Sequence, residues 1–161
     1  MTEVAGRVLR VPRLMPVLNP IAKVLLRAGL PMGFNGLMTV PGRTSGLPRT
    51  TPLAIIEHEG RRWVWSPWGD VQWVRNLRAA GQATISVRRR QEAVTAIELD
   101  PTQRIGFFRD VLGPVAHSMP FGVRFIRMLD GVDVDRPLEA ADGRPVFELH
   151  TALAGGKAVE S

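Results

Sequence analysis

Short runs of β-favouring residues, separated by tight turns, constrain the fold of this chain more than any other feature. The turns His58-Glu59-Gly60 and Arg89-Arg90-Gln91 are too short to hold a crossover helix, so the runs beside them should pair as antiparallel neighbours. We therefore expect a mainly β fold of the α+β class, an antiparallel barrel with helices packed on it and not a doubly wound parallel sheet. The expected strands are Leu37–Val40, Arg49–Glu57, Arg61–Ser66, Ala83–Arg88, Glu92–Leu99 and Pro145–His150.

Helices are expected where capping signals and apolar spacing coincide. Asn19-Pro20 and Asp100-Pro101 each place a capping side chain directly before a proline, which suits the first position of a helix. Glycine after a helical run is a natural stop. The expected helices are Pro20–Ala28 before Gly29, Asp70–Ala80 with Asp70 as its cap, Pro101–Leu112 ended by Gly113-Pro114, and Phe121–Leu129.

The length and the composition favour one compact domain. The chain has 161 residues, and 45% of them are hydrophobic, which is enough to build a core without disulfides. We expect a flexible or amphipathic N-terminal segment at 1–18, a single domain at 19–152 and a flexible tail at 153–161.

Residue types that are rare or missing exclude several chemistries. The absence of cysteine excludes disulfides, thiolate metal sites and thiol nucleophiles, and the three histidines show no metal-binding spacing, so no metal site is expected. Neither a GxGxxG nor a GxxxxGK[ST] motif occurs, which leaves dinucleotide and P-loop folds without support.

The positive charge is carried almost entirely by arginine. The net charge is +6, and Lys23 and Lys157 are the only lysines among 21 basic residues. A GC-rich genome would produce this bias, and so would selection for an anionic partner such as a nucleic acid, an acidic lipid or a phosphorylated cofactor. The basic residues are dispersed except at Arg88-Arg89-Arg90, a solvated turn, so we expect no nucleic-acid partner.

The sequence predicts a cytoplasmic protein, because it has neither a membrane-spanning apolar run nor a secretory signal. The expected helix Pro20–Ala28 is apolar on one side and carries Lys23 and Arg27 on the other. Such a helix can close the end of a core or lie against the inner face of the membrane, and both readings stay open. The oligomeric state, monomer or homodimer, also stays open.

Gly42–Arg49 is the most informative stretch of the chain. Its glycines would let successive backbone N–H groups point into one concavity, an anion-binding nest, with Arg43 and Arg49 on either side and hydroxyls from Thr44 and Ser45. The alternative is an ordinary polar hairpin loop.

All four tryptophans fall between Trp63 and Trp73. Core packing explains Trp63 or Trp65, because alternate residues of a strand face one side. It explains Trp68, which lies in a Pro/Gly loop, less well. A flat ligand against these indoles would account for both observations.

Three ordered blocks carry a family resemblance. They are Thr39-x2-Gly42-Arg43-x-Ser45-Gly46-x2-Arg49-x2-Pro52-Leu53, Val64-x-Ser66-x2-Gly69 and Trp73-x2-Asn76-Leu77-x-Ala79. In these blocks the sequence, from about Asn19 to Leu99, resembles the deazaflavin-dependent nitroreductase and F420H2-dependent quinone reductase family. The resemblance implies a split β-barrel of the FMN-binding type. It also implies coenzyme F420, a deazaflavin with a phosphate and an oligoglutamate tail, with FMN as the alternative cofactor.

The resemblance also implies a reaction and roles for individual residues. Hydride transfer from the reduced deazaflavin to a quinone-like or nitro acceptor would be the reaction. A proton would also be needed, and by residue type Ser66 and His117 are the candidate catalytic groups. If the C-terminal helices cover the mouth of the barrel, Phe107, Phe108, Phe121 and Phe125 would wall the acceptor site; otherwise they pack in the core. The implied cofactor-binding residues are Gly42, Arg43, Thr44, Ser45, Gly46, Arg49, Pro52, Leu53, Ser66, Pro67, Trp68, Gly69, Trp73 and Asn76.

Three departures from the family pattern leave the substrate open. Thr44 stands where a basic residue is usual, Pro67-Trp68 replace a smaller and more polar pair, and the chain has no tyrosine. A non-catalytic protein that binds F420 or an apolar ligand such as a fatty acid on the same barrel is therefore the alternative to an enzyme.

Overall fold

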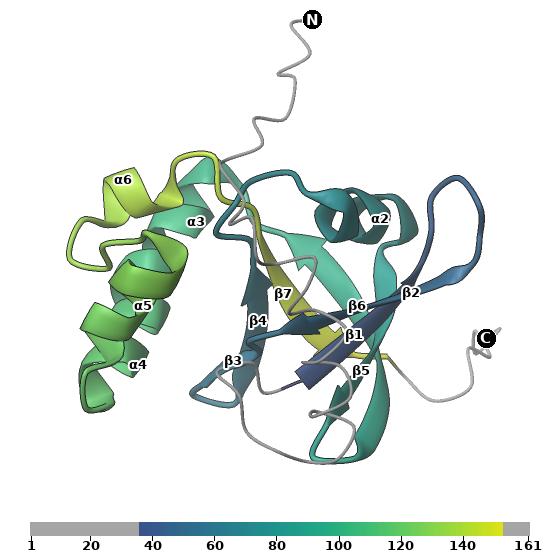
Figure 1. Ribbon diagram of the computed structural model, residues 1–161, viewed down its shortest axis with the longest axis horizontal. Coiled ribbons are helices and arrows are strands. Elements are labelled where there is room, and N and C mark those ends of the chain that lie inside the picture. Colours follow the sequence, from purple (N-terminus) through teal and green to yellow (C-terminus); the bar gives the residue numbers. More distant parts are fainter. Residues whose placement is uncertain (1–35, 153–161) are drawn as a thin grey trace, which may run out of the picture.

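The structure is a computed structural model that describes residues 36–152. Figure 1 shows a curled sheet with one helix, α2, at its upper end and a separate layer of helices on its left side. The strands are β1 (Gly36–Pro41), β2 (Pro48–Leu53), β3 (Ile56–His58), β4 (Arg61–Trp65), β5 (Gln82–Val87), β6 (Arg90–Glu98) and β7 (Val146–Thr151). The helices are α2 (Gln72–Ala80), α3 (Pro101–Phe107), a π-helical segment (Phe108–Leu112), α4 (Gly113–Ser118), α5 (Gly122–Asp130) and α6 (Pro137–Ala141).

The sheet is antiparallel at every pairing and has the order β2-β1-β5-β6-β7-β4-β3. Its two edge strands, β2 and β3, are joined by Ala54 and Ile55 alone. A flat sheet of seven strands would be about 29 Å wide at about 4.8 Å per strand. A two-residue connection spans only about 10 Å. The sheet must therefore curl until its edges approach each other, and this confirms the predicted antiparallel split barrel with helices.

The run Arg49–Glu57 was expected to be one strand, and this expectation is wrong. Its first part pairs with β1, and its last part pairs with β4 on the opposite edge of the sheet. Ile55, at the break, is buried in the barrel core. Threonine, leucine and isoleucine dominate the run, and Pro52 and Ala54 do not by themselves show that the strand changes its partner there.

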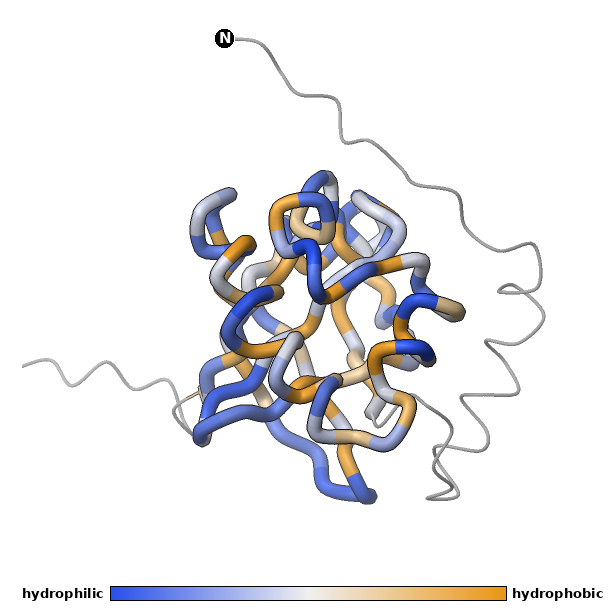
Figure 2. The backbone as a smooth tube through the Cα atoms, turned by 90° about the vertical axis from the view of Figure 1, so that its left-hand side faces the viewer, coloured by the Kyte–Doolittle hydropathy of each residue, from blue (hydrophilic) through white to orange (hydrophobic). Residues whose placement is uncertain are grey.

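Two cores lie on opposite faces of β4 and β7. Val64 and Phe147 face the barrel interior, whereas Trp63, Trp65 and Val146 face the helical layer. Trp65 packs edge to face on Phe108 with ring centroids 5.3 Å apart. The hydrophobic segments, orange in Figure 2, gather where strands and helices face each other, and the turns at the lower end are hydrophilic.

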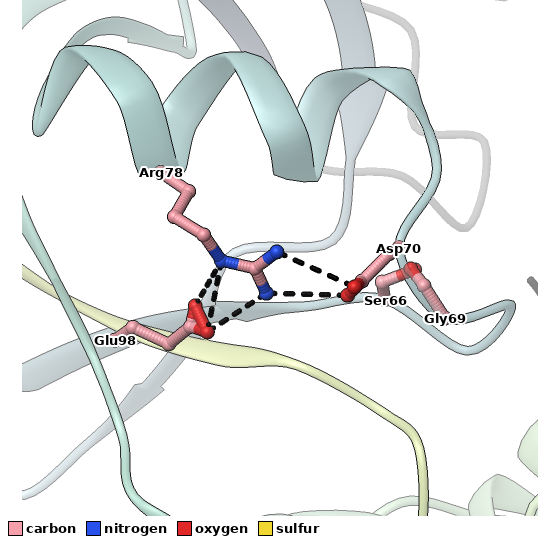
Figure 3. A network of polar contacts seen from close by, with 5 residues as sticks. All are labelled: Ser66, Gly69, Asp70, Arg78 and Glu98. Atoms are coloured by element: carbon pink, nitrogen blue, oxygen red, sulfur yellow. Dashed lines mark hydrogen bonds and ion pairs between the residues drawn. The ribbon is translucent and has the colours of Figure 1, made fainter. Parts of the chain in front are cut away.

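Helix α2 begins one residue later than expected, and Asp70 does not cap it. Val71 is the N-cap residue and makes no side-chain capping bond. The Asp70 carboxylate instead accepts hydrogen bonds from Arg78, which also bonds Glu98 on β6 at 2.8 Å (Figure 3). Arg78, in the last turn of the helix, thus binds the carboxylate that was expected to cap the first turn. Gly81 ends the helix as predicted.

In the C-terminal helices, the predicted capping box is confirmed and the predicted helix end is not. Asp100 and Gln103 form the reciprocal capping box at the start of α3, as Asp100-Pro101 predicted. Gly113-Pro114 was expected to end the helix. Instead the chain continues through the π-helical segment into α4, because proline is tolerated in a first helical turn. The helix Phe121–Leu129 is found as α5, and α6 was missed by the sequence analysis.

The expected helix Pro20–Ala28 and the segments 1–18 and 153–161 lie outside the described residues. Within residues 36–152, no helix has both the length and the apolar character needed to cross a lipid bilayer.

We predict that Glu92→Gln destabilises the fold in a pH-dependent way. Hydrogen bonds from Arg62 and Thr151 lower the pKa of Glu92 to about 2. Its stabilisation is therefore complete above its ordinary pKa and is lost as the pH falls through the native value. At pH 7 the variant should lose about 1 kcal/mol and about 2–4 °C in Tm.

Thermal unfolding at several pH values checks this prediction. The gap between the two proteins should close between about pH 4.5 and pH 2. Glu139→Gln, which changes a more exposed carboxylate 3.4 Å from Arg136, should differ little from the parent at any pH. A gap for Glu92→Gln that stays constant down to pH 2 would contradict the assigned ion pair.

A second prediction concerns Phe121, the N-cap residue of α5. Its side chain is 77% exposed, and its φ of 61° lies in the left-handed region that bulky side chains avoid. Asparagine tolerates this conformation, so Phe121→Asn should stabilise the protein by about 1 kcal/mol in denaturant unfolding. Phe121→Ala keeps the strained backbone and should not stabilise it. Equal stability of all three proteins would show that the corner carries no strain.

Candidate functional site

The hairpin between β1 and β2 projects beside α2 at the upper right of Figure 1. Inside its loop, the Gly42 N–H donates to Leu47 O at 2.8 Å, and the Gly46 N–H donates to Gly42 O at 2.8 Å. Gly46 has a φ of 71°, which favours glycine. A side chain at Gly42 would place its Cβ 2.8 Å from the Ser45 hydroxyl, so the Ser45 side chain would have to shift.

The expected nest of backbone N–H groups is not formed. In addition to the two glycine bonds, the Leu47 N–H donates to the Ser45 hydroxyl, and the Arg43 N–H donates to Asn76 Oδ1. Most N–H groups of the loop therefore donate to acceptors within the loop or on α2. The donors that remain for a ligand come mainly from side chains.

Arg43 is fixed against α2 by two amide groups. One guanidinium nitrogen, Nη1, donates to Asn76 Oδ1 at 2.8 Å and to Gln72 Oε1 at 2.9 Å. Gln72 and Asn76 are four residues apart and so lie on one face of the helix. Asn76 is one of the few buried polar residues, with 6% of its surface exposed. Its oxygen accepts from both the backbone and the side chain of Arg43, which satisfies it.

A cavity of about 170 Å³ lies between the hairpin loop and α2. Its lining contains two arginines, two hydroxyls and two carboxamides, and no acidic residue. Such donors suit a phosphate or a carboxylate and do not suit a cation. The residues present therefore fit the anionic part of a cofactor. The lining residues are Gly42, Arg43, Thr44, Ser45, Arg49, Gln72 and Asn76.

The predicted site residues thus divide into two groups. The structure brings Gly42, Arg43, Thr44, Ser45, Arg49 and Asn76 together around the cavity. The others do not line it; they are Gly46, Pro52, Leu53, Ser66, Pro67, Trp68, Gly69 and Trp73.

Ser66 and the loop after it form a braced turn. The Ser66 hydroxyl is fully buried and donates to Gly69 O at 2.6 Å, and the Ser66 N–H donates to Pro145 O. Arg144 Nε donates to Pro67 O at 3.0 Å. The Ser66 hydroxyl is therefore committed to backbone structure, and its catalytic role stays a prediction.

The tryptophans do not form the expected single surface. Trp63 and Trp65 belong to the core beneath the helical layer, and Trp73 belongs to the barrel core beside Phe147. Each is at most 9% exposed, so packing accounts for all three. Trp68 alone of the four is half-buried.

His117 lies in the helical layer, at the opposite side of the molecule from the hairpin (Figure 1). Its Nε2 lies 2.8 Å from Asp135 Oδ1, and both side chains are more than half exposed. Phe107 and Phe108 are buried in the core of that layer, and Phe121 points to solvent. The side chain of Phe125 lies outside the described part of the structure.

The sequence analysis missed Gln72. Its signal was present, because Gln72 precedes Asn76 by one helical turn and the predicted helix already placed both on one face. A glutamine carries no charge, however, and at the start of a helix its residue type alone does not indicate a binding role.

Comparison with solved structures gives distant likenesses. An F420-H2 dependent reductase shares 20% identity over 71% of this chain and 92% of its own, with a TM-score of 0.46. A conserved hypothetical protein from Mycobacterium tuberculosis shares 13% over 93% and 86%, with a TM-score of 0.48. A pyridoxamine 5'-phosphate oxidase-related, FMN binding protein from Nostoc punctiforme shares 14% over 89% and 83%, with a TM-score of 0.47. No curated protein matches the chain significantly.

Comparison with protein families gives one match, which covers the hairpin, α2 and the cavity between them. It is to F420H(2)-dependent quinone reductase and spans residues 26–119, more than half of the chain. The sequence blocks that carried the resemblance lie inside these bounds. The chain therefore belongs to the F420H(2)-dependent quinone reductase family.

Proposed function

We propose that this protein is an F420-dependent oxidoreductase that transfers a hydride between reduced deazaflavin and a conjugated electrophile, a quinone-like or nitro compound. The observation that carries the proposal is a cavity with two arginines and no acidic residue, in a chain of the F420H(2)-dependent quinone reductase family. When bound, the cofactor supplies the hydride, a two-electron step that protein side chains cannot perform.

The residues of this chain would bind and orient. Arg43 and Arg49 would hold the phosphate and the acidic tail through charge-assisted hydrogen bonds. Thr44 and Ser45 add hydroxyl donors to the same cavity. A tail with several negative charges makes fuller use of two arginines than a single phosphate does, so we rank F420 above FMN.

One observation favours a second candidate, a protein that binds F420 without turning it over. The buried Ser66 hydroxyl donates a hydrogen bond to Gly69 O, and His117 lies in the helical layer beside Asp135, so neither proposed proton donor is both free and near the hairpin. Reduction of a quinone or nitro group needs a proton as well as the hydride, and water would then have to supply it.

Titration of the purified protein with F420 and with FMN, followed by fluorescence, tests cofactor choice. Reduced F420 is then mixed with menadione or a nitroaromatic, and its oxidation is followed. The proposal expects tighter binding of F420 than of FMN, and oxidation that depends on the protein. Binding without turnover across a panel of acceptors would favour the binding protein, and failure to bind F420 would exclude both.

We predict that Arg49→Ala weakens F420 binding by about 1.5–3 kcal/mol, the size of a charge-assisted hydrogen bond. Within residues 36–152 the Arg49 side chain has no hydrogen-bond or ion-pair partner, and its backbone pairing in β2 is untouched by the change, so the Tm should not fall. Arg43→Ala should weaken binding similarly and also lower the Tm, because Arg43 ties the hairpin to α2. Arg109→Ala, in the helical layer, is the matched control and should bind F420 normally. Normal affinity in both cavity variants would place the cofactor elsewhere.

A further inference from the structure

The groups that hold Arg43 are electrically neutral. Its Nη1 donates to the side-chain oxygens of Gln72 and Asn76, and both acceptors are carboxamides. Within residues 36–152, no carboxylate lies within 4 Å of its guanidinium nitrogens. The side chain is therefore fixed in direction while its positive charge stays uncompensated.

Other arginines of the chain are held differently. Arg61 bonds Glu148 at 2.7 Å, and Arg62 bonds Glu92 at 2.6 Å. Arg78 provides the sharpest contrast, because it belongs to α2 itself and is clamped between two carboxylates (Figure 3). The bonds from Glu98 and Asp70 raise the pKa of Arg78. Carboxylates thus neutralise Arg61, Arg62 and Arg78, whereas amides hold Arg43 at the cavity. Arg144 is also held by neutral groups, but these are backbone carbonyls away from the cavity lining.

The same bonds remove acceptors from the cavity. Asn76 Oδ1 accepts two hydrogen bonds from Arg43, and Gln72 Oε1 accepts one. These are the amide oxygens of the lining side chains. The lining then offers a ligand the guanidinium of Arg49, the remaining N–H groups of Arg43 and the hydroxyls of Thr44 and Ser45. This donor set suits an oxyanion.

We propose that Gln72 and Asn76 form a neutral anchor, a pair of positioning residues that aim Arg43 at the cavity without neutralising it. The anchor would make the site selective for ligands with ionised phosphate or carboxylate oxygens. The inference rests on the proposed function, because the oxyanion that it assigns to this place is the anionic part of F420. Gln72 contributes as much as Asn76 does, although it stands outside the blocks that carried the resemblance.

Gln72→Glu and Gln72→Ala together test the anchor. Glutamate keeps a hydrogen-bond acceptor for Arg43 and places a negative charge at the start of α2, so the variant should keep its fold and its Tm. It also neutralises Arg43, so F420 affinity should fall about tenfold or more. Alanine removes one hydrogen bond and adds no charge, and the fall should be about two- to fivefold.

The order of these affinities is the decisive readout. A merely structural glutamine predicts the reverse order, because glutamate would replace the lost hydrogen bond and alanine would not. The neutral anchor is overturned if Gln72→Glu binds F420 as tightly as the parent or more tightly than Gln72→Ala. The dependence of affinity on salt should also be shallower in Gln72→Glu, since the site has lost net positive charge.

Gln91→Glu is the matched control. It makes the same charge change on an exposed residue of the β5–β6 hairpin, at the lower end of the sheet, and should change affinity less than twofold (Figure 1). An equal loss in Gln91→Glu and Gln72→Glu would reduce the effect to overall charge and overturn the proposal.

Calorimetric titration with inorganic pyrophosphate separates this inference from the proposed function. If the parent binds pyrophosphate and not F420, the proposed function fails, and the same variants titrated with pyrophosphate decide on the anchor. If the parent binds neither, the cavity is no oxyanion site and both proposals fall.

Discussion

The two-residue connection between β2 and β3 is the constraint on which the rest of the structure depends. Ala54 and Ile55 join the two edges of a seven-stranded sheet, so the sheet cannot lie flat. Curling it creates an enclosed interior for Val64, Phe147 and their neighbours. It also leaves the β1–β2 hairpin projecting beside α2, where its loop can contact a helix face. The cavity is thus a consequence of how the sheet rolls up.

The curled sheet also explains why one strand can be buried on both faces. The inner face of β4 packs in the barrel, and its outer face is covered by the helical layer. Each tryptophan of β4 therefore packs between the sheet and the helices. Large aromatic side chains supply much buried apolar area per residue, which suits an interface formed by short helices.

Sequence reasoning succeeded where the signal is local. The capping box at Asp100 needs only residues that are three positions apart, and it formed as expected. Reasoning failed where the outcome depends on a distant competitor. Asp70 looked like a cap until Arg78 and Glu98 were brought beside it, and the loop after Pro41 looked like a nest until Asn76 took one of its N–H groups. Arg43 and Arg49 could be predicted from the sequence, because two arginines beside a glycine-rich loop already indicate an anion site. The contact of that loop with Gln72 and Asn76 on α2 could be seen only in the folded structure.

The attachment of the hairpin loop to α2 would couple the order of the loop to the binding of a ligand in the cavity. Three hydrogen bonds from Arg43, all to neutral acceptors, join the loop to the helix in the described structure. An anion held by Arg43 and Arg49, which both belong to the hairpin, would add contacts to the loop and slow its opening. By thermodynamic reciprocity, any change that stabilises the attached loop also raises the affinity of the cavity for the anion. Slower hydrogen exchange at the backbone amides of the hairpin loop would then report that an anion occupies the cavity.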